Sequence, residues 1–303
     1  MIATTGFFDG VHLGHRLVIE RLVSLARERG DESLVVTFWP HPRAVLQDGA
    51  RELRLLNSLE EKKELLRGLG VDRVEVLDFT RTFAALTAEQ YLREILRDRF
   101  GVTTLLMGYD NRLGSDRLTA GALKPIAEGL EIELLELSPL SFRPEPESSL
   151  SFRPSEASGE ISSTQIRAAL ESGDIASATE MLGYGYALQG VVVAGNRLGR
   201  TIGFPTANMR LYEPLKLVPG RGVYVVDVQV LGKTWRGMTN IGQRPTVGGT
   251  FTTIETHILD FDEDIYGLPL RITFLRRLRD EVRFPSLEAL KRQLEMDRDC
   301  CRE

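Results

Sequence analysis

Apolar positions in the first 137 residues alternate between two spacings. Short, mainly apolar runs, which are typical of strands, lie at residues 34–39, 74–79, 102–107 and 132–137, and the first of them is of the buried type. Between these runs the apolar residues recur at the spacing of one helix face, and capping-box residues open two of the stretches, at 58–61 and 87–90. Strands that alternate with helices in this way predict a parallel sheet with helices on both faces.

The first residues of the chain combine a strand, a turn and a helix start. A short apolar strand runs into Gly6, an acidic turn follows at Asp9, and His12 and His15 come where a helix should begin. The helical spacing then continues until Gly30. Unpaired backbone N–H groups and the helix dipole make such a start an anion-binding site. Two imidazoles beside it indicate nucleotide chemistry.

Two further segments follow predicted strands, at residues 40–42 and 108–114. Because parallel strands end at one edge of a sheet, and ligands bind at that edge, we expect these segments to join residues 6–15 in one site. Three of the four histidines of the chain, at positions 12, 15 and 41, fall in the three segments.

Three interpretations of these histidines are open. His12, His15 and His41 could bind zinc, although no cysteine and few acidic residues lie near them in the sequence. The two helix histidines could instead pack in the core or cap the helix. Contact with nucleotide phosphates is the interpretation that we favour.

The chain changes character after residue 137. The five-residue segment LSFRP at 140–144 recurs ten positions later at 150–154, as a tandem near-duplication within a Pro-, Ser- and Glu-rich stretch that covers 138–160. We interpret this stretch as a flexible insertion, with a lid over the neighbouring site as the alternative. Two short helices are expected next, over residues 164–172 and 174–182.

From residue 186 onward the apolar runs are of β type and are separated by Gly and Pro. This pattern predicts a small antiparallel barrel, or a sandwich as the alternative. A helix should close the chain from about Ser286, with Leu287, Leu290 and Leu294 facing inward.

The segment ISSTQIR at residues 161–167 is a candidate phosphate contact. Ser163 or Thr164 can cap the helix that follows, and Arg167 lies one turn in, where its guanidinium could bind phosphate oxygens. A capped helix with a surface arginine is the simpler alternative.

A glycine-rich segment between two predicted strands is the second candidate site. Gly195, Gly199 and Gly203 would allow the backbone to approach a phosphate chain closely. Thr206 and Asn208 then offer a hydroxyl and an amide, oxygen ligands that suit Mg²⁺. A glycine-rich hairpin without this chemistry is the alternative.

The strand FTTIETHILDF at residues 251–261 carries an unexpected carboxylate. Strand alternation puts Glu255 and His257 on one face and Ile254 and Ile258 on the other. A carboxylate within an apolar strand is costly unless it is paired, solvated or functional. A base for a substrate hydroxyl would fit. The alternative is a salt bridge to one of three arginines, Arg271, Arg276 or Arg279.

Composition narrows the class of protein without deciding the function. A length of 303 residues suggests about two domains. The net charge of −5 gives no reason to expect nucleic acid as a partner, and no apolar run approaches the length of a membrane helix. We expect a cytoplasmic protein whose partners are small molecules, with Cys300 and Cys301 as free thiols. The sequence does not address the oligomeric state.

The motifs together resemble a known family. GFFDGVHLGH, TFWPHP, the segment 108–114 and ISSTQIR resemble the FAD synthetase module, and GVVVAGNRLGRTIGFPTANM, GVYVVDV, NIGQRPT, IETHILDF and LRDEVRF resemble the riboflavin kinase module. The order matches over nearly the whole chain, as in bacterial bifunctional riboflavin kinase/FAD synthetases. The resemblance implies a Rossmann-like nucleotidylyltransferase domain over residues 1–183, and a riboflavin kinase barrel with a C-terminal helix over 184–303.

The resemblance also implies two successive reactions. The second module would phosphorylate riboflavin to FMN with ATP and Mg²⁺, with Glu255 as base and Thr206 and Asn208 at the metal and phosphates. The first module would adenylylate FMN to FAD with a second ATP and release pyrophosphate. In that step His12 and His15 would bind the ATP phosphates. Ser163, Thr164 and Arg167 would bind the pyrophosphate, and the further contacts implied are Gly6, Phe8, Asp9, His41 and Asp110.

Three other functions remain open. A riboflavin kinase with an inactive first module would make FMN alone, and a flavin-binding regulatory protein would turn over neither substrate. The first module could also adenylylate a different phosphorylated acceptor, which the kinase-like second half disfavours.

Overall fold

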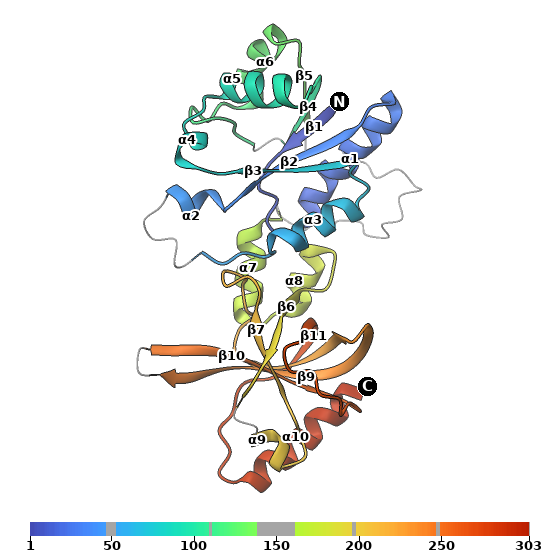
Figure 1. The fold of residues 1–303 in the computed structure, drawn as a ribbon, viewed down its shortest axis with the longest axis vertical. Coiled ribbons are helices and arrows are strands. Elements are labelled where there is room, and N and C mark those ends of the chain that lie inside the picture. The colour runs from blue at the N-terminus through green and yellow to red at the C-terminus, as the bar shows by residue number, and fades with distance from the viewer. Residues whose placement is uncertain (47–52, 109–110, 138–160, 196–197, 247–248, 303) are drawn as a thin grey trace. The chain divides into compact units, whose positions relative to one another are not determined.

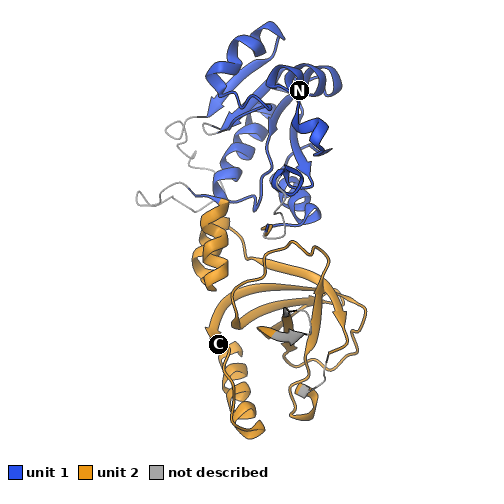
Figure 2. Ribbon diagram, turned by 90° about the vertical axis from the view of Figure 1, so that its left-hand side faces the viewer, with its two compact units in different colours: residues 1–53, 57–162 blue, residues 54–56, 163–303 orange. Residues whose placement is uncertain are grey.

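The structure is a computed structural model that describes residues 1–46, 53–108, 111–137, 161–195, 198–246 and 249–302. Backbone contacts divide the chain into two compact units (Figure 2). The first unit is Met1–Leu53 with Asn57–Ser162, and the second is Arg54–Leu56 with Ser163–Glu303. The boundary expected after residue 183 stays a prediction. The duplicated segment within 138–160 and the candidate residue Asp110 lie outside the described residues.

The first unit is built on a five-stranded parallel sheet in the order β3-β2-β1-β4-β5, which confirms the predicted sheet (Figure 1). Its strands are β1 (Ile2–Thr5), β2 (Ser33–Trp39), β3 (Arg73–Asp78), β4 (Thr104–Gly108) and β5 (Glu133–Leu137). The order reverses direction at β1, which has β2 on one side and β4 on the other. Such a reversal is where nucleotides bind in sheets of this kind.

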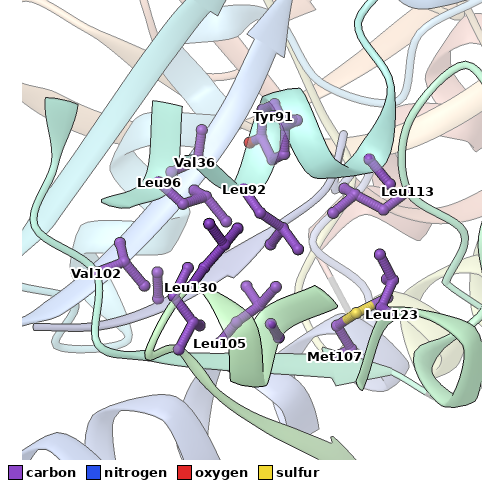
Figure 3. Close-up of a cluster of buried hydrophobic side chains, with 14 of the residues drawn as sticks. Val36, Tyr91, Leu92, Leu96, Val102, Leu105, Met107, Leu113, Leu123 and Leu130 are labelled. Atoms are coloured by element: carbon purple, nitrogen blue, oxygen red, sulfur yellow. The ribbon is translucent and has the colours of Figure 1, made fainter. Parts of the chain in front are cut away.

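Alternate residues along the strands face two separate cores, as the strand period of two requires. Ala3 and Leu105 belong to one core, whereas Ile2 and Leu106 belong to the other. Figure 3 shows the first core, in which side chains of the strands, among them Val36 and Leu105, lie in one cluster with Tyr91 and Leu92. Because each face of the sheet is apolar, helices must cover both.

Helices lie between the strands of this unit, as the sequence pattern predicts, and two short helices at 42–46 and 81–84 come in addition. They are α1 (Leu13–Arg29), α2 (Pro42–Leu46), α3 (Leu59–Gly68), α4 (Arg81–Ala84), α5 (Ala88–Gln90) and α6 (Ala120–Gly129). The capping boxes at Ser58 and Thr87 are both present. After Thr87, however, the chain forms a π-helix, η2 (Tyr91–Arg99), in place of the expected α-helix, and Tyr91 and Leu96 of this helix are buried.

The second unit opens with two short helices, α7 (Ser163–Ser172) and α8 (Ile175–Leu182), close to their predicted ranges. Asp174 caps α8 by accepting a hydrogen bond from the Ser177 backbone N–H at 3.0 Å. Ser163 and Thr164 lie inside α7 and not before it, so the prediction that either of them caps this helix is wrong.

A closed barrel follows in the order β10-β7-β6-β11-β8-β9, which decides between the predicted barrel and the sandwich. Its strands are β6 (Ala187–Val193), β7 (Ala207–Leu211), β8 (Gly222–Val230), β9 (Lys233–Thr246), β10 (Gly249–Ile258) and β11 (Pro269–Arg279). All of the pairings are antiparallel, and closure leaves the sheet without free edges. One short helix, α9 (Leu198–Thr201), interrupts the connection between β6 and β7.

The chain ends in α10 (Leu287–Arg302), which Ser286 caps by accepting a hydrogen bond from the Ala289 backbone N–H at 3.2 Å. Leu294 packs on the barrel core, but Leu287 is 51% exposed, so its predicted inward position is wrong. A residue in the first turn of a helix can extend beyond the surface that the later turns cover.

Cys300 and Cys301 are free thiols as predicted, and Cys301 is buried in the core. No helix of the described residues is long and apolar enough to cross a membrane.

Candidate active sites

The carboxyl edge of the parallel sheet carries the first candidate site. β1 pairs with both β2 and β4 in parallel register, so the segments after these strands start at the same edge. The predicted convergence of residues 6–15 and 40–42 is therefore confirmed. The turn before α1 contains two non-glycine residues with positive φ, Phe8 at 51° and Val11 at 36°. Such backbone strain is common where a binding site shapes a turn.

His12 and His15 stack at the start of α1. Their ring centroids are 3.7 Å apart with an interplanar angle of 18°. His12 caps the helix, because its Nδ1 accepts a hydrogen bond from the His15 backbone N–H at 3.4 Å. The capping alternative is therefore confirmed for His12, and it leaves Nε2 of His12 to carry the ring proton in the neutral form.

His15 has a buried Nδ1 atom for which the described residues supply no hydrogen-bond partner. Burial lowers the pKa of His15 well below its ordinary range, and the charges of His12 and Lys62 lower it further. A buried polar atom without a partner is costly unless a ligand satisfies it. This atom makes the helix start a candidate binding site.

Aromatic rings of the same turn support the histidines. The Phe8 ring meets the His15 ring edge-on at 5.3 Å and is itself buried. It covers Gly6 so closely that a Cβ there would lie 3.0 Å from the ring. His41 packs against Phe7 at 4.2 Å between ring centroids, and the described residues include no group of three metal-binding side chains. The structure therefore gives the zinc interpretation no support.

Lys62 is a buried cation that our sequence analysis missed. Its side chain is 0% exposed, and its Nζ lies 3.5 Å from the centroid of the Phe7 ring and 3.4 Å from Oγ1 of Thr37. Burial lowers the pKa of Lys62 to about 8, which the charge of Asp9 partly opposes. Leu59 and Leu66 lie at helical spacing on either side of Lys62. This position on an apolar face of the helix could have indicated from the sequence that Lys62 is buried.

The carboxylate of Asp9, a predicted ligand contact, is also buried. Its Oδ1 accepts a hydrogen bond from the Asn57 backbone N–H at 3.4 Å. Asp9 therefore helps to hold the residue before the capping box of α3.

Ser163, Thr164 and Arg167 belong to the second unit. The Nε of Arg167 donates a hydrogen bond to the Arg54 carbonyl at 2.8 Å, within that unit. Their predicted grouping with His12 and His15 around one nucleotide stays a prediction.

The barrel contains the second candidate site, a cavity of about 640 Å³. This volume is within the range of sites for cofactor-sized molecules. Its walls combine apolar side chains with a few polar ones. The lining residues are Gly199, Ile202, Phe204, Thr206, Val223, Met238, Asn240, Glu255, His257, Arg279, Glu281, Val282, Phe284, Leu290 and Leu294.

Glu255 lies on the cavity side of β10, between two asparagines. It is opposite Asn208 of β7 and opposite Asn240 of β9 in the antiparallel register. Directly opposed residues have Cβ atoms about 4.5–5.5 Å apart. Ile254 and Ile258 are buried on the other face of the strand, so the predicted alternation is confirmed. Sequence analysis missed Asn240, although it belongs to the NIGQRPT motif.

The glycines of the β6–β7 connection serve different purposes. A Cβ at Gly195 would lie 2.2 Å from Nδ2 of Asn208, and one at Gly199 would lie 2.1 Å from the Phe204 carbonyl oxygen. Both glycines therefore permit close packing of the segment that contains Thr206. Gly203 instead has a φ of 84°, a conformation that side chains rarely adopt.

Arg279, which our sequence analysis considered as a partner for Glu255, binds Asp297 of α10. Its Nε and Nη2 reach Oδ2 of Asp297 at 3.0 Å and 2.7 Å. Asp297 also accepts a hydrogen bond from Gln293 at 2.9 Å. This buried ion pair attaches α10, one wall of the cavity, to β11.

A parallel-sheet unit and a β-barrel unit, each with a candidate site, are the architecture of an enzyme that transfers phosphoryl and nucleotidyl groups. Residues 1–151 match the FAD synthetase family model, and residues 182–303 match the riboflavin kinase family model. The chain belongs to the bifunctional riboflavin kinase/FMN adenylyltransferase family.

Relatives that carry this family name match almost the whole chain. The protein from Listeria monocytogenes is 37% identical over 98% of this chain and 90% of its own length. That from Escherichia coli K12 is 38% identical over 100% and 92%. A crystal structure described as a macrolide-efflux protein from Streptococcus pneumoniae has a TM-score of 0.88 and 32% identity, and it covers 100% of this chain and 93% of its own.

Proposed function

We propose that the chain performs two reactions in sequence. The barrel unit transfers the γ-phosphoryl group of ATP to the terminal ribityl hydroxyl of riboflavin, giving FMN and ADP. The parallel-sheet unit then transfers the adenylyl group of a second ATP to the FMN phosphate, giving FAD and pyrophosphate. Matches to both family models support two activities over a kinase with an inactive first unit.

In the kinase reaction Glu255 acts as the base that accepts the proton of the attacking hydroxyl. Its place in the cavity, beside Asn208 and Asn240, is the observation that carries the proposal. A carboxylate that can reach the hydroxyl contributes to catalysis by removing its proton as the new bond forms.

Thr206 and Asn208 would hold Mg²⁺ and the ATP phosphates. Their hydroxyl and amide oxygens are ligands of the kind that Mg²⁺ takes, and Gly195 leaves room for the Asn208 amide where a Cβ would collide with it. The ion, when bound, neutralises charge on the phosphates.

In the adenylylation reaction His12 and His15 bind the phosphates of ATP at the start of α1. The protonated Nε2 of neutral His12 can donate to a phosphate oxygen, and the unpartnered Nδ1 of His15 supports a ligand at this place. Ser163, Thr164 and Arg167 would bind the departing pyrophosphate. Both reactions then depend on positioning and electrostatics and need no covalent intermediate.

Product analysis tests the proposal directly. Purified protein is incubated with riboflavin, ATP and Mg²⁺, and the flavins are separated by chromatography over time. We expect FMN first and FAD afterwards. FMN without FAD, even when FMN is supplied, would contradict the adenylylation half. The absence of FMN would contradict the kinase half and favour a flavin-binding regulatory protein.

A further inference from the structure

His257, which has no role in the proposed reaction, makes a hydrogen bond beside the candidate kinase site. Its Nδ1 lies 2.8 Å from the carbonyl oxygen of Pro205. A carbonyl oxygen only accepts hydrogen bonds, so Nδ1 of His257 carries the proton and donates it. The neutral ring is therefore in the Nδ1–H form.

The Pro205 carbonyl belongs to the segment that enters β7 and precedes Thr206 directly. Residues 204–206 form no regular secondary structure, and proline has no N–H to donate. A backbone hydrogen bond restrains the segment at its start, from the Phe204 N–H to the Gly199 carbonyl at 2.8 Å. The contact from His257 restrains it at the next residue.

His257 also lies where such a restraint matters for the cavity. It is two residues from Glu255 on the same face of β10, and both side chains line the cavity with Thr206. Its ring packs against Phe204 at 5.1 Å between centroids, and Arg298 of α10 lies 5.8 Å from the centroid of the same Phe204 ring. The imidazole thus connects β10, which carries Glu255, to the segment that carries Thr206.

We propose that His257 is a positioning residue of the kinase site, whose Nδ1–H bond to Pro205 holds Thr206 in place beside Asn208, which the β7–β10 ladder keeps opposite Glu255. The inference rests on the proposed kinase function. His257 transfers no proton in this role, since the donor nitrogen is occupied by the Pro205 carbonyl. In this role it helps to set where the phosphates and the cation bind.

Two variants of the full-length chain separate this role from simple packing. His257→Asn keeps an amide N–H near the position of Nδ1, whereas His257→Leu has a similar size without a donor. We expect His257→Leu to raise the KM for MgATP in riboflavin phosphorylation by about tenfold, as the loss of one hydrogen bond would. The KM for riboflavin should change little, and His257→Asn should restore most of the loss.

Adenylylation of supplied FMN by the same preparations serves as the internal control, because it uses the other unit. Equal KM values for MgATP in wild type and His257→Leu would overturn the proposal. So would equal defects in the Leu and Asn variants, because the donor would then not matter.

A spectroscopic measurement on the wild-type protein tests the contact without turnover. The chain has four histidines, so ¹⁵N NMR of the imidazoles is simple to assign with His257→Asn. We expect the Nδ1–H tautomer for His257, and an Nε2–H tautomer would overturn the proposal. Failure of the wild type to make FMN would instead overturn the kinase function itself, whatever tautomer is observed.

Discussion

Glu255 and Asn208 are directly opposite each other on the antiparallel strands β10 and β7. Residues that are directly opposite each other on two hydrogen-bonded strands keep their relative position as long as the backbone hydrogen bonds between the strands are intact. The proposed base and the proposed metal ligand are thus fixed to each other by backbone hydrogen bonds. The barrel supplies this rigidity, and the cavity beside Glu255 offers space for the proposed substrate.

Removing the charge of Glu255 should stop the kinase reaction. Glu255→Gln preserves shape but cannot accept the hydroxyl proton, so we expect kcat for FMN formation to fall by roughly 100-fold or more. Chromatography of the flavins measures the rate. Glu263→Gln, at an exposed position of the same unit, is the matched control and should behave as wild type. A Glu255→Gln enzyme with normal FMN formation would mean that Glu255 is not the base.

A methyl group at Gly195 should disturb the same site. In Gly195→Ala the new Cβ would meet Nδ2 of Asn208 at 2.2 Å, so the amide must move. Overpacking of this kind costs about 1–3 kcal/mol, and we expect kinase kcat/KM for MgATP to fall by at least about tenfold. Gly121→Ala in α6, where a Cβ meets nothing within 4 Å, is the control. Unchanged kinetics in Gly195→Ala would show that the Asn208 amide has no role in binding MgATP.

His12 should be required for FAD formation and dispensable for FMN formation. His12→Ala removes the imidazole and also the cap of α1, so a second variant is needed to separate the two effects. His12→Asn retains a capping oxygen but has no imidazole. We expect both variants to lose conversion of FMN to FAD by roughly 100-fold, and only His12→Ala to lose about 1 kcal/mol of stability. Equal losses of FMN and FAD formation would contradict two separate sites.

Lys62 should make stability depend on pH in the alkaline range. Its folded pKa of about 8 is below the ordinary value for lysine, so between that value and about pH 10.5 the unfolded chain binds more protons than the folded one. Stability therefore rises with pH through this window, by at most about 3 kcal/mol for this group. We expect the Lys62→Met variant to lack this increase of stability with pH.

Thermal melting at pH 7.5 and pH 10 measures this effect. Relative to Lys62→Met, the wild type should gain stability as the pH increases. Lys63→Met is the matched control, because the neighbouring ammonium group pairs with Glu60 at 3.0 Å on the surface. A wild type and a Lys62→Met variant with the same pH dependence would show that Lys62 is not desolvated in the folded protein.

Local patterns were sufficient for the elements and for part of each site. The period of two placed Glu255 and His257 on one face of a strand and the isoleucines on the other, because alternation is a property of any extended backbone. Likewise the run from a strand through Gly6 to His12 predicted a helix start with imidazoles beside it, since capping depends on residues a few positions apart.

Other features depended on packing between segments distant in the sequence. Leu287 is exposed and Lys62 is buried because of how their helices pack on the rest of each unit. Helical spacing alone does not show which turns of a helix other segments cover. The place of Asn240 beside Glu255 follows from the register of β9 and β10.

The sequence by itself thus determined the order of the main strands and helices, the two family modules and most of the candidate site residues, because these depend on local spacing and on motifs. Only the tertiary structure decided that the β half closes into a barrel, that Asn208 and Asn240 flank Glu255, and that His257 reaches Pro205. The physical reason is that strand register and side-chain burial are set by long-range pairing, in which each contact depends on all the others.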